Sequence, residues 1–433
     1  MARVIIGHCI LFLLSTCVIN QVEASFRLGE KGPRISGFFE FAFGGKLESD
    51  ITKLDDFNML EQRLQLETSF YPKFSTLLKK WGTGINFKGD VLIDEYYGGK
   101  TEFELRELNA IFSPLSWMDC KFGRQVFTWG TGDYMFVNDL FPKDYVSFYI
   151  GRDDEYLKKP SDGMKFSLYS KKVNFDMVII PVFEPNTIFT GDRLSFFDSF
   201  QGGIAGRNSE RYLAEPAQQF NNTEYATRLY RNFGSYEVAL YTFRGFYKMP
   251  RGYLDEARKI LFYPRLDAYG MSTRGPALGG IMNFEAGYYH SQQDSQGNNR
   301  LIENSIAKCL VGYDKDLGND FRAGLQYLYE QILEYSNYRD ALLSQDFRWD
   351  EHRHVASLRL TKLFKNQTVR VNLFTFFSPS DLDGYIRPSI DYDVSDDFKV
   401  TLGANLVWGE DDHAEFGQMQ NNDNIYLRAR YSF

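Results

Sequence analysis

The feature that most restricts the fold of this chain is an alternation of apolar and polar residues with a period of two. It is strict at the C-terminus, where the apolar positions are Ile425, Leu427, Ala429, Tyr431 and Phe433. Successive side chains of a β-strand point to opposite faces, so this stretch predicts a strand with one apolar face and one polar face that carries Arg428 and Arg430. Because the pattern reaches the last residue, the final strand is expected to be an integral part of the fold.

The same alternation recurs toward the N-terminus and gives eighteen predicted strands in all, with sixteen as the alternative count. The predicted strands cover 35–44, 58–71, 83–96, 102–112, 117–128, 161–169, 173–183, 223–232, 235–246, 261–274, 279–290, 304–314, 320–332, 352–364, 368–377, 386–394, 398–408 and 425–433. Long links, such as 129–160 and 184–222, alternate with short turns, such as 395–397. An even number of antiparallel strands with long loops at one end and short turns at the other is typical of a bacterial outer-membrane barrel.

A closed barrel has a physical reason, because backbone N–H and C=O groups inside a bilayer must be paired within the protein. The predicted fold class is therefore all-β, a transmembrane antiparallel up-and-down β-barrel whose last strand pairs with its first. A secreted soluble β-sandwich or β-helix is the alternative, since it also shows alternation. The long charged residues on the polar faces and the number of strands argue against it.

The N-terminus predicts export. Residues 1–24 have one early cation, Arg3, then an apolar core that is too short and too interrupted to span a bilayer, and they end in a Val-x-Ala processing site. We therefore predict a signal peptide at 1–24, a barrel at 25–433 and a location in the outer membrane of a Gram-negative bacterium. The formal net charge of −8 does not indicate a nucleic-acid partner. In the exported part, Cys120 and Cys309 are expected to be packed thiols, with one disulfide as the alternative.

If the apolar faces meet lipid, the polar faces line a lumen. The residues predicted to form the lumen wall and solute pathway are Arg63, Lys88, Asp90, Glu104, Arg106, Arg359, Arg370, Arg387, Asp391, Arg428 and Arg430. The early strands contribute mainly acids and the last five mostly arginines, so closure is expected to place a basic wall beside an acidic one. Such a transverse field favours polar solutes. The alternative is that the opposed charges pair and brace the wall. The alternation slips at 107–112 and 235–246.

The last strand resembles the C-terminal signal by which barrel-assembly machinery recognises outer-membrane proteins. The positions that match it are Leu427, Tyr431 and Phe433. The resemblance implies that this machinery is a partner of the chain during assembly.

A second resemblance lies in the middle of the chain. The passage FGRQVFTWGTGDYMFVNDLFPKDY at 122–145 is similar to a Gly-Arg-Gln, Trp-Gly, Asn-Asp passage of porin-like outer-membrane families, which include alginate-export-type barrels and uncharacterised members. Residues 224–250 resemble a hairpin of the same proteins. The resemblance implies that an external loop begins in this passage and folds inward, whereas turn chemistry alone would make it an anchored loop. The residues concerned are Asn138, Asp139, Pro142 and Asp144.

Catalytic and metal chemistry is weakly indicated. His352 and His354 would share one strand face without a third ligand. The acidic residues of 314–320 are spaced as in a calcium-binding loop, but the closing Glu is missing. Residues 409–415 form an acidic loop. No Ser-His-Asp spacing or nucleophile elbow is present in the sequence. We therefore expect no catalytic residue, no metal site, no cofactor and no enzyme activity.

The function favoured by these patterns is passive passage of small hydrophilic solutes, and of anionic ones in the narrower form of the hypothesis. The alternatives are a barrel that serves as a sheath or export conduit for a polysaccharide or redox partner, and a surface receptor or adhesin. Expected partners are outer-membrane lipid, lipopolysaccharide and small polar solutes, and the oligomeric state is left open. If a loop closes the bore, the long link 184–222 is the segment expected to do so.

Overall fold

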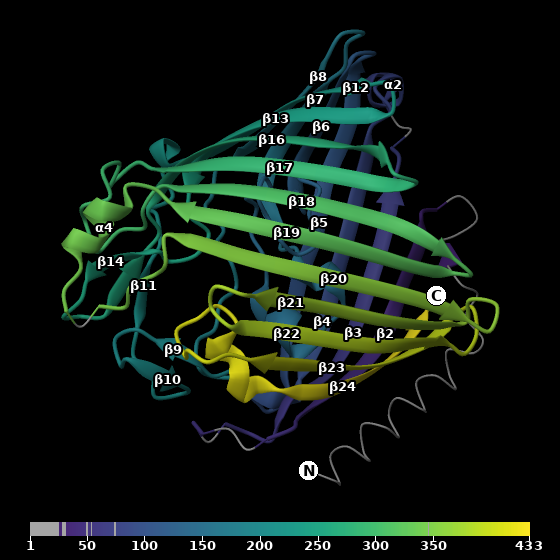
Figure 1. Cartoon of the computed structure of the whole chain (residues 1–433). Coiled ribbons are helices and arrows are strands. Elements are labelled where there is room, and N and C mark those ends of the chain that lie inside the picture. Colours follow the sequence, from purple (N-terminus) through teal and green to yellow (C-terminus); the bar gives the residue numbers. More distant parts are fainter. Residues whose placement is uncertain (1–25, 28–31, 49–50, 53, 73–74, 345) are drawn as a thin grey trace.

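The computed structural model describes residues 26–27, 32–48, 51–52, 54–72, 75–344 and 346–433, and it contains one closed barrel (Figure 1). The eighteen barrel strands are β2 (Arg34–Lys46), β3 (Phe57–Phe70), β4 (Gly84–Asp94), β5 (Lys100–Leu115), β6 (Met118–Gln125), β7 (Ser161–Leu168), β8 (Asn174–Ile180), β12 (Glu224–Phe233), β13 (Tyr236–Phe246), β16 (Arg265–Ala277), β17 (Gly280–Ser291), β18 (Ile306–Gly318), β19 (Phe321–Ile332), β20 (His352–Phe364), β21 (Val369–Ser378), β22 (Asp383–Asp393), β23 (Phe398–Trp408) and β24 (Asn424–Ser432). Each overlaps one predicted strand. The predicted fold class and the count of eighteen are confirmed.

The barrel closes where its last strand meets its first. β24 pairs antiparallel with β2, with Arg430 opposite Glu40 in the register. The pairing extends to the final residue, because the Phe433 N–H donates to the Gly37 carbonyl and the Gly37 N–H donates to the Phe433 carbonyl, both at 2.9 Å. Gly37 is required there, since a Cβ on it would lie 2.0 Å from the Gln65 carbonyl oxygen.

The two ends of the barrel differ, as the link lengths predicted. Short connections at one end, here called the turn end, join hairpins such as β18–β19 and β22–β23, and the link between β3 and β4 there contains α2 (Thr76–Lys80). The other end, here called the loop end, carries the long links and their small elements. These are η1 (Glu95–Tyr97), α3 (Tyr145–Ile150), η2 (Asp154–Leu157), β9 (Phe196–Asp198), β10 (Gly203–Ala205), β11 (Tyr212–Ala214), η3 (Phe220–Asn222), β14 (Gly252–Asp255), β15 (Ile260–Phe262), α4 (Tyr335–Ala341) and η4 (Gly417–Asn422). A further short strand, β1 (Phe26–Arg27), pairs with β2.

The outward face of the barrel is apolar and exposed. On β23 and β24, Leu402, Ile425 and Leu427 are each more than 40% exposed, although all three are large hydrophobic residues. A wall that turns such side chains outward all along its strands is suited to contact with lipid hydrocarbon. Among the described residues, no helix is both long and apolar enough to cross a membrane.

The irregular alternation near 107 has a structural cause. The pairing of β4 with β5 shifts between Lys88–Glu107 and Gly89–Leu105, so Arg106 is the extra residue of a β-bulge. A bulge lets two residues oppose one and exchanges the faces that follow it. Leu105 therefore points outward before the bulge and Leu108 after it, while Arg106 stays on the inward side.

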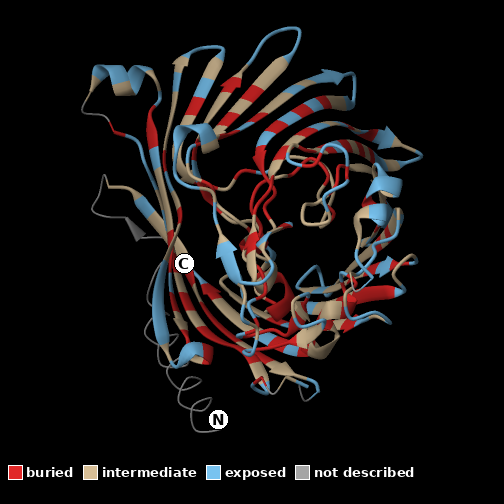
Figure 2. Cartoon of the chain, turned by 90° about the vertical axis from the view of Figure 1, so that its left-hand side faces the viewer, coloured by how far each residue is buried: buried red, intermediate tan, exposed pale blue. Residues whose placement is uncertain are grey.

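The irregular alternation at 235–246 has a different cause, because apolar residues face the lumen there instead of the polar ones expected from the sequence. On β13 the inward residues are Ala239, Tyr241 and Phe243, and all three are buried. Phe243 belongs to a hydrophobic cluster with Phe127 and Phe141 of the long link between β6 and β7, and Tyr241 contacts Trp129 of the same link. Viewed into the loop end, Figure 2 shows buried stretches of the long links inside the ring of strands. Apolar residues thus face inward wherever a loop covers them.

Two further predictions concern the N-terminus and the cysteines. The signal peptide at 1–24 lies outside the described residues. Cys120 on β6 and Cys309 on β18 are free thiols, as expected, but only Cys120 is fully packed, since Cys309 is half-buried.

We predict that deletion of Phe433 reduces the amount of folded barrel in the outer membrane, because both seam hydrogen bonds to Gly37 are lost. Phe433→Ala is the matched control, since it removes the ring but keeps the backbone bonds. The folded fraction is measured by heat-modifiable mobility on gels. Equal loss in both variants would assign the effect to the aromatic ring as an assembly signal, and no loss in the deletion would contradict a role for the seam.

Candidate functional site: the constriction inside the barrel

The segment 126–160, between β6 and β7, folds into the barrel and is here called the inserted loop. Its helix α3 begins after Asp144, whose carboxylate accepts hydrogen bonds from the Ser147 N–H at 2.9 Å and from the Ser147 hydroxyl at 2.7 Å. It ends at Gly151, which adopts a left-handed conformation with φ 87°. The inward-folding loop implied by the sequence resemblance is therefore present, and Asp144 supports it by capping.

One side of the inserted loop is held by a carboxylate on β17. Glu285 is fully buried, and its Oε1 accepts from the Thr131 hydroxyl and the Gly132 N–H, both at 2.9 Å, as well as from the Thr131 N–H. Its Oε2 accepts from the Asn138 N–H at 3.1 Å and from Asn138 Nδ2 at 2.7 Å. Five donors of one loop thus converge on a single carboxylate, which fixes the loop against the wall.

A glycine on the neighbouring strand makes room for this anchor. Gly270 on β16 faces inward, and a Cβ at this position would lie 1.8 Å from Asn138 Oδ1. Asn138 also donates to the Met271 carbonyl of β16 at 3.2 Å.

The opposite side of the inserted loop is held by β3, β4 and β5. The ring of Tyr156 lies between two guanidinium groups, with Arg63 Cζ 4.0 Å and Arg106 Cζ 4.6 Å from its centroid. Its hydroxyl donates to Asp90 at 2.7 Å, and Arg63 forms an ion pair with the same carboxylate at 2.6 Å. Arg63, Asp90 and Arg106 are therefore anchors for the inserted loop.

Further ion pairs follow the inserted loop around the wall. Arg152 pairs with Glu61 of β3 at 2.6 Å, and Glu155 pairs with Lys88 of β4 at 2.8 Å. Arg106 also donates to the backbone carbonyls of Glu155 and Lys158. Glu104 contacts Arg63 at 3.3 Å and Arg106 at 2.9 Å, so it completes this charged group.

The arginines of the last strands meet acids of the inserted loop. Arg359 lies 3.2 Å from Asp133 and 2.7 Å from Asp314, and Arg387 lies 2.8 Å from Asp154. Arg428 lies 2.9 Å from Asp153. These arginines stand on β20, β22 and β24, and each is opposed by a carboxylate of the inserted loop, with Asp314 of β18 as a further acid beside Arg359.

Asp153 joins two of these arginines. Arg428 and Arg430 both contact its carboxylate, and Arg430 also pairs with Glu40 of β2 at 2.8 Å. Burial raises the pKa of Asp153, but the two guanidinium groups outweigh this effect and lower the pKa to about 2. The contact at the closure seam is therefore charged throughout the neutral range.

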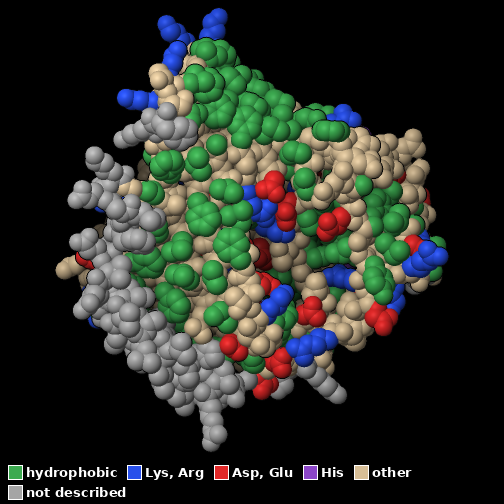
Figure 3. All heavy atoms as spheres, turned by 180° about the vertical axis from the view of Figure 1, so that it is seen from behind, with side chains coloured by type: hydrophobic (Ala, Val, Ile, Leu, Met, Phe, Trp, Pro, Cys, Tyr) green, Lys and Arg blue, Asp and Glu red, His purple; other side chains and the backbone are tan. Residues whose placement is uncertain are grey.

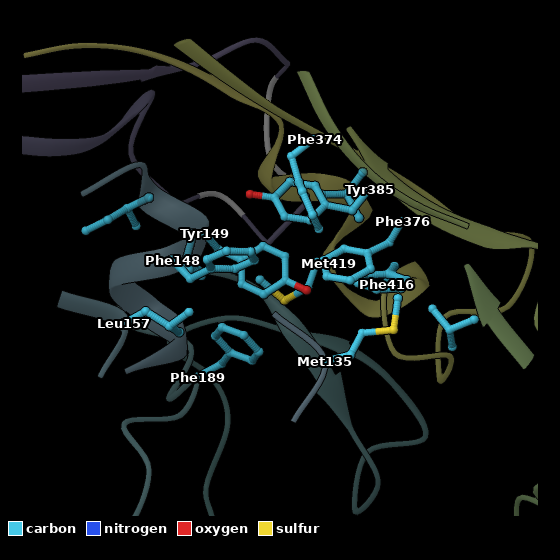
Figure 4. Packing of buried hydrophobic residues seen from close by; sticks show 14 of the residues in the cluster. Met135, Phe148, Tyr149, Leu157, Phe189, Phe374, Phe376, Tyr385, Phe416 and Met419 are labelled. Atoms are coloured by element: carbon cyan, nitrogen blue, oxygen red, sulfur yellow. The ribbon is translucent and has the colours of Figure 1, made fainter. Parts of the chain in front are cut away.

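An aromatic cluster fills part of the lumen beside β21 and β22 (Figure 4). Phe148 and Tyr149 of α3 pack on Tyr385, with ring centroids 5.5 and 5.2 Å apart. Tyr149 also contacts Phe189 of the link 181–223, and Phe376 contacts Phe416 of the link 409–423. Three loops therefore pack together inside the barrel. The link 184–222 also reaches the wall, where Arg193 pairs with Glu61 and Asp94, and its role in closing the bore stays a prediction.

Two predicted lumen residues do not touch the inserted loop. Asp391 on β22 accepts hydrogen bonds from Thr401 at 2.7 Å and from Asn372 at 3.1 Å, which are wall residues. Arg370 on β21 is exposed, lies opposite Asp391 in the register, and makes no ion pair with any residue that the structure describes. The role of the predicted residues as a solute pathway stays a prediction.

Sequence reasoning did not single out Glu285, Tyr156 or the acids Asp153 and Asp154. Glu285 carried a usable signal, since it stands among aromatic and small residues in a run that is otherwise poor in charge. The loop acids carried none, because an acidic loop is ordinarily solvated.

The weak metal candidates have other partners. His352 and His354 both face outward on β20, and each ring nitrogen Nδ1 lies within hydrogen-bond distance of a tyrosine hydroxyl, that of Tyr329 and Tyr327 respectively. In the part of the chain that the structure describes, no group of three or more His, Cys, Asp or Glu side chains could hold a metal ion.

Comparison with known proteins places the fold. No family model matches the chain, and no curated protein matches it significantly. Among solved structures it is similar to OccD3 (OpdP) of Pseudomonas aeruginosa, with 9% identity and a TM-score of 0.53 over 94% of this chain and 93% of that one. It is also similar to OccAB3 of Acinetobacter baumannii, with 9% identity and a TM-score of 0.53 over 92% of this chain and 98% of that one. Both are outer-membrane porins.

The chain folds as a porin-like outer-membrane β-barrel. Its outward apolar face and its closed sheet place it in the outer membrane of a Gram-negative bacterium. At 9% identity, the likeness concerns the fold. The resemblance of 122–145 and 224–250 to alginate-export-type barrels stays an expectation.

We predict that Glu285→Ala loosens the inserted loop of this porin-like barrel, because its donors lose their common acceptor. Each donor left without a partner costs on the order of 1–3 kcal/mol where water cannot replace it. The expected result is protease cleavage within 126–160 in the folded, detergent-solubilised protein, where the wild-type chain resists.

Glu237→Ala is the matched control for this measurement. Glu237 is also an inward carboxylate, but it pairs with Arg228 of the wall at 2.5 Å. Equal cleavage in the two variants, or none in Glu285→Ala, would show that Glu285 does not hold the loop.

Proposed function

We propose that the protein is a passive channel for small hydrophilic solutes across the outer membrane, with a preference for anions. The observation that carries this proposal is the row of arginines on β20, β22 and β24, which stands against the acids of the inserted loop inside a closed barrel. A solute that crosses the barrel at this level passes between fixed charges of opposite sign. Such a field orients and admits polar solutes and disfavours apolar ones.

The preference for anions is supported by lumen cations that form no ion pair with the acids of the loop. Arg370 on β21 and Arg274 on β16 are both exposed on the inward face. Neither takes part in an ion pair among the described residues. Cations along a water-filled wall concentrate anions within about a Debye length, which is about 8 Å at physiological salt.

The alternative of a sheath for a folded partner has less support. A sheath needs an open bore, whereas the inserted loop contacts β3, β4 and β5 on one side and β17 and β20 on the other. A receptor or adhesin would use the surface of the loop end, and the buried packing of the loops inside the barrel favours a role within the lumen.

We predict that purified protein forms single channels in planar bilayers. Arg387→Glu combined with Arg428→Glu is expected to shift the reversal potential in the direction of cation selectivity. The effect should be large near 0.1 M salt and small at 1 M salt, because the Debye length falls from about 10 Å to about 3 Å.

A charge swap provides the control, because these two arginines pair with Asp154 and Asp153. Adding Asp153→Arg and Asp154→Arg restores both pairs with reversed polarity and returns the lumen to its original net charge. Selectivity is then expected to return toward that of the wild type. If the ion selectivity is unchanged in the variant with both arginines reversed, these arginines only brace the wall. If neither the wild type nor the Glu285→Ala variant conducts ions in planar bilayers, the proposal that the protein is a channel is wrong.

A further inference from the structure

Helix α2 at the turn end lies against the lipid-facing side of the barrel. Trp81, the residue that follows this helix, stacks on Phe112 of β5, with ring centroids 5.7 Å apart. Phe112 is separated from the outward Leu108 by an even number of residues along β5, so it points outward as well. The Trp81 ring therefore covers part of the outward face, and it brings α2 to the side of the wall that contacts lipid.

Backbone hydrogen bonds join this link to the next two links at the turn end. The Ser113 N–H donates to the Trp81 carbonyl at 2.9 Å, and the Tyr169 N–H donates to the Trp117 carbonyl at 2.8 Å. The three segments form one continuous border of β4 to β8, here called the basic edge, which consists of 71–83, 113–117 and 169–173.

The basic edge carries exposed lysines that have no carboxylate partner. They are Lys79 and Lys80 at the end of α2, and Lys171 and Lys172 between β7 and β8. None of the four forms an ion pair with a residue that the structure describes, whereas Lys121, on the inward face of β6, pairs with Glu107 at 3.4 Å. The sequence of the basic edge contains no Asp or Glu. Its positive charge is therefore not neutralised from within the edge itself.

Large apolar side chains lie beside these lysines. Leu77 of α2 is 50% exposed and Trp117 is 49% exposed. The outward row of rings continues from Phe112 to Phe122 at 5.5 Å, and Phe122 meets Phe166 edge-on at 5.3 Å. Seen from behind, Figure 3 shows hydrophobic side chains gathered at the top of the molecule, bordered by lysine and arginine, where Figure 1 places β7, β8 and α2. The basic edge thus joins an apolar surface to a group of cations.

The opposite side of the turn end has a different charge. The turn between β22 and β23 contains Asp396 and Asp397. Lys399, which follows this turn, lies 3.6 Å from Asp393. Lysines and acids are therefore mixed on that side, and the unopposed positive charge is concentrated at β4 to β8.

The turn end of an outer-membrane barrel faces the periplasm, where the wall meets the phospholipid leaflet of the membrane. Tryptophan rings favour the boundary between hydrocarbon and head groups. A lysine at this boundary lays its aliphatic stem along apolar surface and extends its ammonium group to the head groups. Clustered lysines next to a bilayer attract anionic lipids. The basic edge combines these features on one side of the barrel.

We propose that the basic edge binds anionic phospholipids of the periplasmic leaflet. The rings and Leu77 contact acyl chains, and the four ammonium groups contact the phosphates of the head groups. A lipid is favoured over a periplasmic protein because Trp81 covers the same outward face as Phe112 and Phe122, which is the face suited to hydrocarbon. This surface lies outside the barrel, so the proposal is independent of the channel function.

The test is lipid binding to the delipidated protein in detergent, measured by native mass spectrometry. The two lipids are phosphatidylglycerol and phosphatidylethanolamine with identical acyl chains. The wild type is expected to bind phosphatidylglycerol more tightly, by at least about fivefold, which is the effect of one lysine near an anionic surface. Replacing the four lysines of the basic edge by glutamine should remove this preference.

A matched control changes the net charge equally at the other side of the turn end. It replaces by glutamine the four lysines Lys315, Lys362, Lys365 and Lys399. This variant should keep the preference for phosphatidylglycerol. A wild type without the preference, or an equal loss of it in the two variants, would overturn the proposal.

A second measurement locates the lipid without charge variants. In bilayers of the same two lipids, brominated acyl chains quench nearby tryptophan fluorescence. The contribution of the basic edge is the difference between the wild type and the variant with Trp81→Phe and Trp117→Phe. Brominated phosphatidylglycerol is expected to quench these rings more than brominated phosphatidylethanolamine at the same mole fraction. The difference should shrink at 1 M salt, where the Debye length is about 3 Å. Equal quenching by the two lipids at low salt would contradict a lipid site at the basic edge.

Discussion

The structure depends on the requirement that backbone hydrogen bonds inside a bilayer be satisfied within the chain. Eighteen strands meet it by pairing in sequence and by closing β24 on β2, down to the bonds between Phe433 and Gly37. Closure also decides which charges meet at the seam. Arg430 faces Glu40 because the last strand and the first must be neighbours.

Closure leaves an interior that is too wide to be filled by wall side chains alone, and the long links occupy it. The inserted loop carries aromatic residues and carboxylates, and the wall has complementary partners for both. Where the wall is aromatic, as at Tyr385, it packs on α3, and where it is basic, as at Arg387, it pairs with a loop acid. The charged groups therefore hold the loop, and this bracing role is compatible with the transport role proposed for them.

The sequence by itself determined the fold class, the eighteen strands, the two unequal ends and the inward placement of residues such as Arg387 and Arg428. It could do so because the period of two is a local property of a strand and is fixed by contact with lipid on one side. It did not determine which charges pair, that Arg106 is a bulge residue, or that Glu285 holds the inserted loop. Those contacts join residues far apart in the chain, and alternation carries no information about distance across the barrel. Only the tertiary structure decided them, because closure and loop insertion fix which side chains meet.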